Sequence, residues 1–281
     1  RMSQMAPEHR VSEVWDDAPS GRSRGPRLIE ALSSGGPLAQ IVSLLSLLVI
    51  WQLFVMVSGI RPYLLPAPTQ IFVELFDSFS VLIEHTWVTL VESLAGFLIA
   101  AVVGVGLAVV MVAVPFLRGL VMPGLVAFNV VPKVAFAPLL IIWLGLGIQS
   151  KIALSFLIAF FPIVVNTITG LIDIEPEMLN LVKLMKARSR LQFTKIRLPH
   201  ALPAMFDGFK IALPIAIIGA IVAEFVASSE GLGYLIVAAG VQLNTTLVFA
   251  SIFMIVIFSM VLYALLLFVE SRFLSWRPSA R

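Results

Sequence analysis

A basic segment at about 173–210 holds the residues of this chain that are best suited to bind another protein. Its middle reads EPEMLNLVKLMKARSRLQFTKIRLPHALP. Apolar residues repeat there at helical spacing, and cations line another face of the same helix. The pattern predicts a short basic amphipathic helix, which can bind a groove on a partner or rest on a bilayer surface. Pro199 and Pro203 are expected to end the segment, because proline supplies no amide donor.

Two ionisable residues, Lys133 and Glu224, stand inside long apolar stretches. A charge at the centre of a membrane helix costs about 2.5–3.5 kcal/mol, so each predicts a polar cavity or a partner. Two prolines flank Lys133 and predict a kinked helix. Lys133 is then expected to meet an anionic solute, to pair with Glu224, to form a structural salt bridge, or to extend its ammonium to the membrane interface. Glu224 is expected at a gate, in a contact with a partner, or as a structural cap. Phe136 and Phe160 are candidates to line a solute pathway, although lipid contact and packing explain such residues more often.

Other kinds of chemistry have little material in this sequence. The chain of 281 residues has no Cys, and its three His are far apart, which disfavours thiolate sites, metal centres and histidine triads. No GxxxxGK[ST] sequence is present to bind nucleotide phosphates, so the chain is not expected to be an ATPase.

The composition requires a membrane as the solvent. Apolar residues make up 59% of the chain and charged residues 12%, with a mean hydropathy of +1.03, whereas about a quarter of a soluble domain is charged. Each crossing needs about 20 mainly apolar residues. The sequence therefore predicts an all-α, polytopic membrane protein with six transmembrane helices, at about 38–58, 94–114, 124–144, 152–172, 211–227 and 247–269.

The distribution of cations predicts the orientation. If the N-terminus is cytoplasmic, sixteen of the nineteen Lys and Arg fall in inner segments and only Arg61 and Lys151 fall outside. Both termini are therefore expected in the cytoplasm. Residues 1–36 are rich in Ser, Gly and Pro and are expected to form a flexible cytoplasmic tail before a transmembrane domain at 37–281. A helix that begins near Gln70, capped by Thr69, is expected to lie on the outer surface.

The end of the basic segment resembles a known signature. Ile196, Leu198 and Pro199 match the Ile-x-Leu-Pro that ends the cytoplasmic loop of permease subunits of binding-protein-dependent ABC importers, but the EAA start does not match and Lys186 replaces the usual Gly. Further stretches between residues 64 and 276 resemble the branch for nitrate, sulfonates, taurine, bicarbonate and vitamin precursors. They read LLPAPTQIF, PKVAFAPLLIIWLGLG, FFPIVVNTITGL, ALPAMFDGFKIA, AEFVASSEGLGYLI and VESRFLSW.

The resemblance implies the type I ABC importer permease fold, in a homodimer of the prokaryotic inner membrane. It implies two ATPase subunits that bind ATP and Mg, an extracytoplasmic binding protein that delivers a small solute, and import by alternating access. No cofactor in this chain and no nucleic acid partner are implied. The ATPase-docking helix is assigned by resemblance to Leu181, Val182, Lys183, Met185, Lys186, Ala187, Arg190, Ile196, Leu198 and Pro199.

Two other classes of membrane protein compete with this interpretation. A carrier driven by an ion gradient is expected to show an internal repeat or paired broken helices, and the sequence shows neither. An intramembrane protease is disfavoured because no Ser and His pair lies within two spans. The identity of the solute stays open, because no residue chooses among the solutes of the resembled branch.

Overall fold

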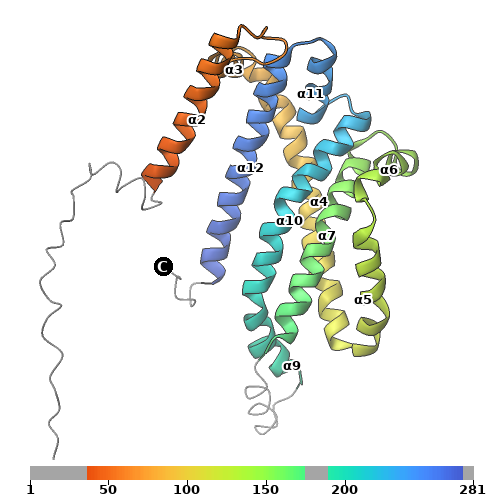
Figure 1. Cartoon of the computed structure of the whole chain (residues 1–281). Helices are drawn as coiled ribbons and strands as arrows, with labels where there is room; N and C mark the ends of the chain where they lie inside the picture. The colour runs from red at the N-terminus through yellow and green to blue at the C-terminus, as the bar shows by residue number, and fades with distance from the viewer. Residues whose placement is uncertain (1–36, 175–188, 275–281) are drawn as a thin grey trace, which may run out of the picture. The chain divides into compact units, whose positions relative to one another are not determined.

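The computed structural model describes residues 37–174 and 189–274 (Figure 1). Every regular element in these two ranges is a helix. Five helices are long and apolar enough to cross a membrane, and a bent pair of shorter helices adds a sixth crossing if it is counted as one. The predicted all-α, polytopic fold is confirmed. The predicted tail at 1–36 and residues 175–188 of the basic segment lie outside the described residues.

The first helix, α2 (Pro37–Ser58), agrees with the first predicted span. It carries no charged residue, and most of its large apolar side chains are exposed. Among the described residues, those at 37–54 belong to a different unit from the one that begins at Val55. A helix that is apolar on every face needs lipid or protein around it.

The centre of the second unit is a bundle of three long helices. These are α4 (Phe79–Ala113), α7 (Ile148–Ile172) and α10 (Leu198–Ala227), and each of them contacts the other two (Figure 1). Their buried residues include many Ala, Gly and Ser. Small residues favour association in a membrane, because van der Waals packing between close backbones replaces the hydrophobic effect as the driving force.

Glycines bring the three backbones together at two levels of the bundle. A Cβ at Gly96, Gly208 or Gly219 would lie 2.9 Å or less from an atom of the neighbouring helix. Between Gly96 and Gly219, the buried Ser155 of α7 donates a hydrogen bond to the carbonyl of Ala216 in α10 at 2.8 Å. The side-chain hydroxyl therefore links two helices at a point where no larger residue fits.

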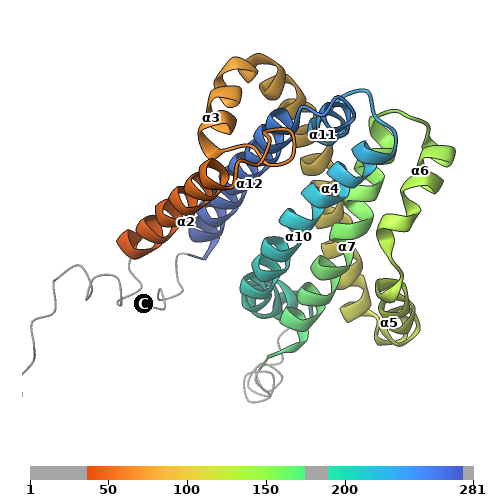
Figure 2. The same cartoon turned by 45° about the horizontal axis from the view of Figure 1, so that its top comes forward.

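The third predicted span is broken. Helix α5 (Pro115–Val130) is followed by a 3₁₀ turn, η1 (Lys133–Phe136), and then by α6 (Ala137–Leu144), and the two halves are bent by 88° (Figure 2). Val131 is extended, as the residue before a proline prefers to be, and Pro132 supplies no amide donor. The predicted kink is confirmed, but the prediction of one span at 124–144 is wrong in length and continuity.

The fifth predicted span, at 211–227, is wrong at its start. Helix α10 already begins at Leu198, after a short helix α9 (Ser189–Gln192) and a π-helical turn η2 (Phe193–Arg197). Pro199 lies in the first turn, where its missing amide costs nothing, and Pro203 lies inside the helix. The expectation that these two prolines end the basic segment is therefore wrong, because the segment continues directly into a core helix.

Two shorter helices lie at one end of the bundle, and a third, long helix runs alongside it. Helix α3 (Pro68–Asp77) packs on α12 (Thr245–Phe273), and the short α11 (Leu232–Val241) contacts α10 and α12. We call this end, where α3 and α11 lie, the α11 end, and the opposite end, where α9 lies, the α9 end (Figure 1). The predicted cap of α3 is wrong.

Ala67, and not Thr69, is the residue that precedes the first turn of α3. Its amide donates to the side-chain oxygen of Gln70 at 3.0 Å, and Pro68 opens the helix. Proline is favoured in the first turn because its backbone is already fixed in a helical conformation. Thr69 lies within the helix.

Candidate functional site

The carboxylate of Glu224 fastens the first turn of α11 to the bundle. Glu224 is buried near the end of α10; its Oε1 accepts a hydrogen bond from the Thr89 hydroxyl at 2.7 Å, and its Oε2 accepts one from the Gly233 amide at 2.5 Å. The Thr89 oxygen in turn accepts from the amide of Leu232 at 2.8 Å. A negative charge at a helix N-terminus is favoured by the free amides there. We call Glu224, Thr89 and the amides of 231–233 the α11 clamp.

Two glycines at the start of α11 make room for this carboxylate. Gly231 has φ +100°, which favours glycine, and a Cβ at Gly233 would lie 2.7 Å from Oε2 of Glu224. The amide of Gly231 donates to Nδ1 of His85 at 3.0 Å. Of the three roles predicted for Glu224, the cap is the one that its contacts support. A gate or a partner contact stays a prediction.

A second buried charge, which the sequence did not assign to the site, lies at the same end. Glu92 of α4 and Lys151 of α7 form an ion pair at 3.4 Å, and their side chains are 1% and 8% exposed. The sequence showed two opposite charges near the ends of two apolar stretches. It did not show that these two ends are neighbours in the fold, or that both side chains are buried. Glu92 also adjoins Glu224, so the ion pair and the α11 clamp are neighbours.

Lys133 lies at the break of the third crossing and is separate from this cluster. Its ammonium donates to the Asn129 side chain at 2.7 Å and lies 5.9 Å from the Phe161 ring centroid. The alternative in which Lys133 pairs with Glu224 is wrong, because no such ion pair occurs among the described residues and both groups have other partners. An asparagine one turn earlier and an aromatic face are sufficient to hold the ammonium.

The two predicted pathway aromatics, Phe136 and Phe160, are half-buried and contact other rings. Phe136 lies 5.8 Å from Phe128, and Phe160 lies 5.4 Å from Phe156, measured between ring centroids. Phe160 also packs against a buried cluster that α4 and α7 form. Their part in a solute pathway stays a prediction.

Part of the predicted docking segment lies at the α9 end. Ile196, Leu198 and Pro199 are half-buried, and Leu198 packs against a cluster that includes the buried Leu171 and Ala201. The side chain of Arg190 and the residues Leu181, Val182, Lys183, Met185, Lys186 and Ala187 lie outside the described residues. The structure thus connects the described end of the segment firmly to the helix bundle.

A polar network joins α10 to α12 nearer the α9 end. The ammonium of Lys210 lies 2.8 Å from a carboxylate oxygen of Asp207 and 2.9 Å from one of Glu270. Asp207 lies one turn before Lys210 in the same helix, whereas Glu270 reaches it from α12. Because α10 and α12 have few other contacts, this bridge supports their alignment.

Replacing Lys210 by Met is expected to lower the thermal midpoint of the purified protein by about 3–12 °C. The change leaves Glu270, which is 17% exposed, without its cation, and such a loss costs about 1.5–3 kcal/mol, at roughly 2–4 °C for each kcal/mol. Lys210→Arg, which retains a cation, is the matched control and is expected to recover most of the midpoint. Equal midpoints for Met and wild type would contradict the prediction.

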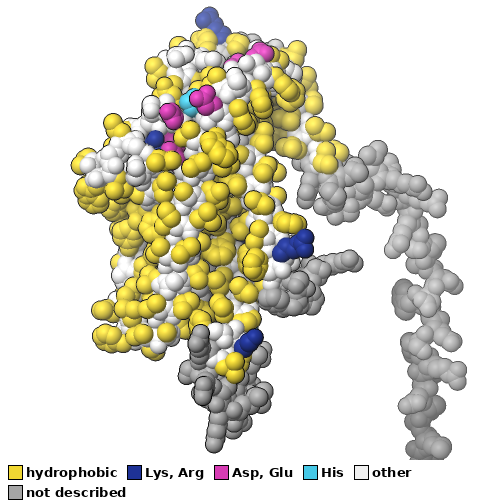
Figure 3. Space-filling model, turned by 180° about the vertical axis from the view of Figure 1, so that it is seen from behind, with side chains coloured by type: hydrophobic (Ala, Val, Ile, Leu, Met, Phe, Trp, Pro, Cys, Tyr) yellow, Lys and Arg dark blue, Asp and Glu magenta, His cyan; other side chains and the backbone are white. Residues whose placement is uncertain are grey.

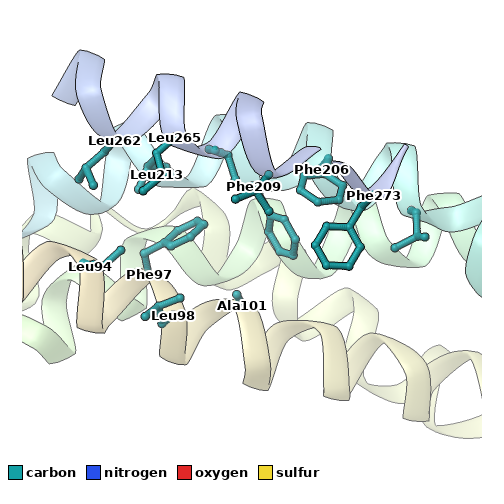
Figure 4. A pocket seen from close by; sticks show the side chains of 13 residues that line it. Leu94, Phe97, Leu98, Ala101, Phe206, Phe209, Leu213, Leu262, Leu265 and Phe273 are labelled. Atoms are coloured by element: carbon teal, nitrogen blue, oxygen red, sulfur yellow. The ribbon is translucent and has the colours of Figure 1, made fainter. Parts of the chain in front are cut away.

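An apolar cavity of about 440 Å³ lies between α4, α10 and α12. Figure 4 shows its wall, to which Phe97, Phe206, Phe209 and Phe273 contribute rings, with leucines between them. Its thirteen lining residues are all apolar, so it offers no side-chain group that would orient a polar solute. The polar groups at the α11 end are therefore the better candidates for solute contact.

Comparisons with known proteins agree with this architecture. A family model described as "Binding-protein-dependent transport system inner membrane component" matches residues 96–275. The formylaminopyrimidine transport permease protein ThiX of Halalkalibacterium halodurans is 36% identical, over 83% of this chain and 93% of its own length. The riboflavin transport system permease protein RibX of Chloroflexus aurantiacus is 33% identical, over 85% and 90% respectively. A chain of the inward-facing MetNI methionine ABC transporter has the same fold, with a TM-score of 0.58, 20% identity, and coverage of 70% of this chain and 95% of its own.

The several apolar crossings, the close-packed bundle and the similarity to these transport proteins together define the permease component of an ABC importer. The chain belongs to the family of inner membrane components of binding-protein-dependent transport systems. It is a multi-pass membrane protein that takes part in import and is not itself an ATPase. Family membership implies partner subunits that hydrolyse ATP and a binding protein that delivers the solute.

Proposed function

We propose that this permease works as a homodimer and that residues 181–199 of its basic segment are the contact for two ATPase subunits. The observation that carries the proposal is the continuity of α10. The segment leads through α9 and η2 into α10, whose far end holds Glu224 and the α11 clamp. A helix of this length, about 45 Å, transmits a displacement along its axis because its backbone hydrogen bonds make it stiff. Movement of the ATPases at the α9 end would thus reach the α11 end.

The distribution of cations supports the orientation that this mechanism needs. With the basic segment in the cytoplasm, the α9 end faces the ATPases and the α11 end faces the binding protein. Both chain termini are then cytoplasmic. ATP and Mg are bound by the ATPase subunits, and this chain needs no cofactor of its own.

The solute that we propose is a small vitamin-precursor-like molecule. The printed functions of two relatives, formylaminopyrimidine transport and riboflavin transport, support this choice among the sulfonates, nitrate and vitamin precursors that the sequence resemblance allows. Both molecules are planar heterocycles with hydrogen-bond donors and acceptors along their edges. Delivery by a separate binding protein means that part of the selectivity lies outside this chain.

Reversing two charges of the basic segment tests the docking role. Lys186→Glu with Arg190→Glu is expected to reduce solute uptake at least tenfold, because the segment would repel the acidic rim that we expect on the ATPase. ATP hydrolysis by the co-purified complex should then no longer respond to the loaded binding protein. Uptake into proteoliposomes and ATPase rate are measured together.

Arg61→Glu is the matched control for this charge reversal. Arg61 is an exposed cation near the α11 end, and its variant is expected to keep both uptake and stimulated hydrolysis. Normal uptake in the double variant, or a wild-type chain that purifies without any nucleotide-hydrolysing subunit, would refute the proposed function.

A further inference from the structure

A second cavity, of about 360 Å³, opens near the α11 end beside the Glu92–Lys151 ion pair. Its walls come from α4, from the start of α7 and from the loop before α11, and they include Trp87, Val91, Ser229 and Glu230. Figure 3 shows Lys, acidic and His side chains gathered toward this end of the molecule, above a surface that is otherwise mainly apolar. We call this space the outer cavity. Ligand sites have volumes of about 300–1,000 Å³, so it suits a small solute.

The charged groups in the wall of the outer cavity have unused hydrogen-bonding capacity. Glu92 is buried, yet neither of its carboxylate oxygens makes a well-aligned hydrogen bond to any residue that the structure describes. Lys151 approaches it at 3.4 Å, and its ammonium has three N–H groups. A buried ion pair is stable only when further hydrogen bonds satisfy the remaining donors and acceptors. A bound molecule can supply them here, because both groups line the cavity.

The neighbouring charges favour an uncharged solute. One cation, Lys151, stands beside Glu92 and Glu224, and Glu230 lies at the rim. His85, which packs near the same loop, accepts a hydrogen bond from Gly231 through Nδ1 and therefore carries no proton on that nitrogen. An anion would meet more negative than positive charge, and a cation would compete with Lys151 for Glu92. A neutral molecule meets neither difficulty.

We propose that the outer cavity is a binding site, within the permease itself, for a small neutral solute that carries a hydrogen-bond donor next to an acceptor. The solute donor bonds to a carboxylate oxygen of Glu92, and the ammonium of Lys151 donates to the solute acceptor. Val91 and Trp87 provide apolar wall for a planar ring. An aminopyrimidine edge or a cyclic amide has this pair of groups. The inference rests on the proposed function in one respect: the bound molecule is taken to be the solute that the transporter imports.

Binding of 4-aminopyrimidine, which is neutral at pH 7.5, tests the site directly. The purified permease with its co-purified partners is placed in nanodiscs, and binding is measured by titration calorimetry without nucleotide. Saturable binding is expected, with Glu92→Gln and Lys151→Met each weakening it at least tenfold. Val91→Phe fills the cavity without touching the charges and is expected to abolish binding. Taurine, which is charged at both ends, is expected to bind more weakly than 4-aminopyrimidine.

Glu84→Gln is the control for the loss of a carboxylate, because Glu84 is exposed on α4 and does not line the outer cavity. It is expected to bind 4-aminopyrimidine like the wild type. Absence of saturable binding, binding that survives Val91→Phe, or tighter binding of taurine would overturn the inference. These results leave ATPase co-purification and stimulated hydrolysis unaffected, so a failure of the site is distinguished from a failure of the proposed function.

Discussion

Replacing Glu224 by Ala is expected to lower the thermal midpoint of the purified protein by about 2–12 °C and to abolish uptake. The change removes the acceptor of the Thr89 hydroxyl and of the Gly233 amide, both of which are buried. A buried group left without its partner costs about 1–3 kcal/mol, at roughly 2–4 °C for each kcal/mol. The first turn of α11 then detaches from the bundle, and the link that we propose between α10 and the α11 end is lost.

Two variants make this prediction specific. Glu224→Gln keeps one acceptor oxygen and is expected to lose about half as much stability as Glu224→Ala, because its amide group faces one of the two donors instead of accepting from it. Glu84→Ala removes an exposed carboxylate elsewhere at the α11 end and is expected to keep the wild-type midpoint. If the midpoint of Glu224→Ala lies within about 1 °C of the wild-type midpoint, the α11 clamp adds little stability.

Replacing Gly96 by Leu is expected to prevent assembly of the bundle. Even a Cβ at this position would lie 2.5 Å from Cβ of Ser155 and 2.9 Å from the backbone carbonyl oxygen of Ile152. The backbone of α7 cannot move away from this side chain without separating α7 from α4. That separation would also disturb the hydrogen bond between Ser155 and Ala216. Overpacking of a few methylenes costs about 1–3 kcal/mol, and a leucine adds a whole side chain. The protein should be lost from the monodisperse peak in size-exclusion chromatography.

Gly106 is the matched control, because it lies on the same helix and a Cβ there would meet no atom within 4 Å. Gly106→Leu is expected to insert, fold and elute like the wild type, with a small gain in helix propensity. The pair therefore separates the loss of a glycine from the loss of space. Normal elution of Gly96→Leu would mean that α4 and α7 are farther apart in the membrane than the structure shows.

The parts of the fold that could be predicted are those that depend on residues close together in the chain. Long uncharged runs and the prolines around Lys133 act locally, so the crossings and the kink in the third one followed from the sequence. The start of α10 could not be predicted in the same way. Prolines normally mark helix ends, but Pro203 lies inside α10, where neighbouring helices compensate for the lost hydrogen bond.

The site shows the same division between local and tertiary information. Glu224 was predicted as a residue of interest because a charge in an apolar stretch is costly wherever it lies. Its acceptor role depended on the approach of Thr89 from α4 and of the α11 amides, which no local pattern indicates. Lys133 was assigned a carboxylate as a possible partner, whereas an amide one turn away holds it. Glu92 was assigned no role, because its ion pair is with Lys151 in another helix and no local pattern indicates that contact.

The sequence by itself determined that this chain is an all-α membrane protein of the binding-protein-dependent permease type, because hydropathy and motif order are properties of successive residues. Only the tertiary structure decided which charges meet, how sharply the third crossing bends and where the polar cavity lies. The physical reason is that burial and ion pairing depend on contacts between helices that are far apart in the chain. In a bilayer these contacts are set by small residues and backbone approach, for which the one-dimensional pattern gives little signal.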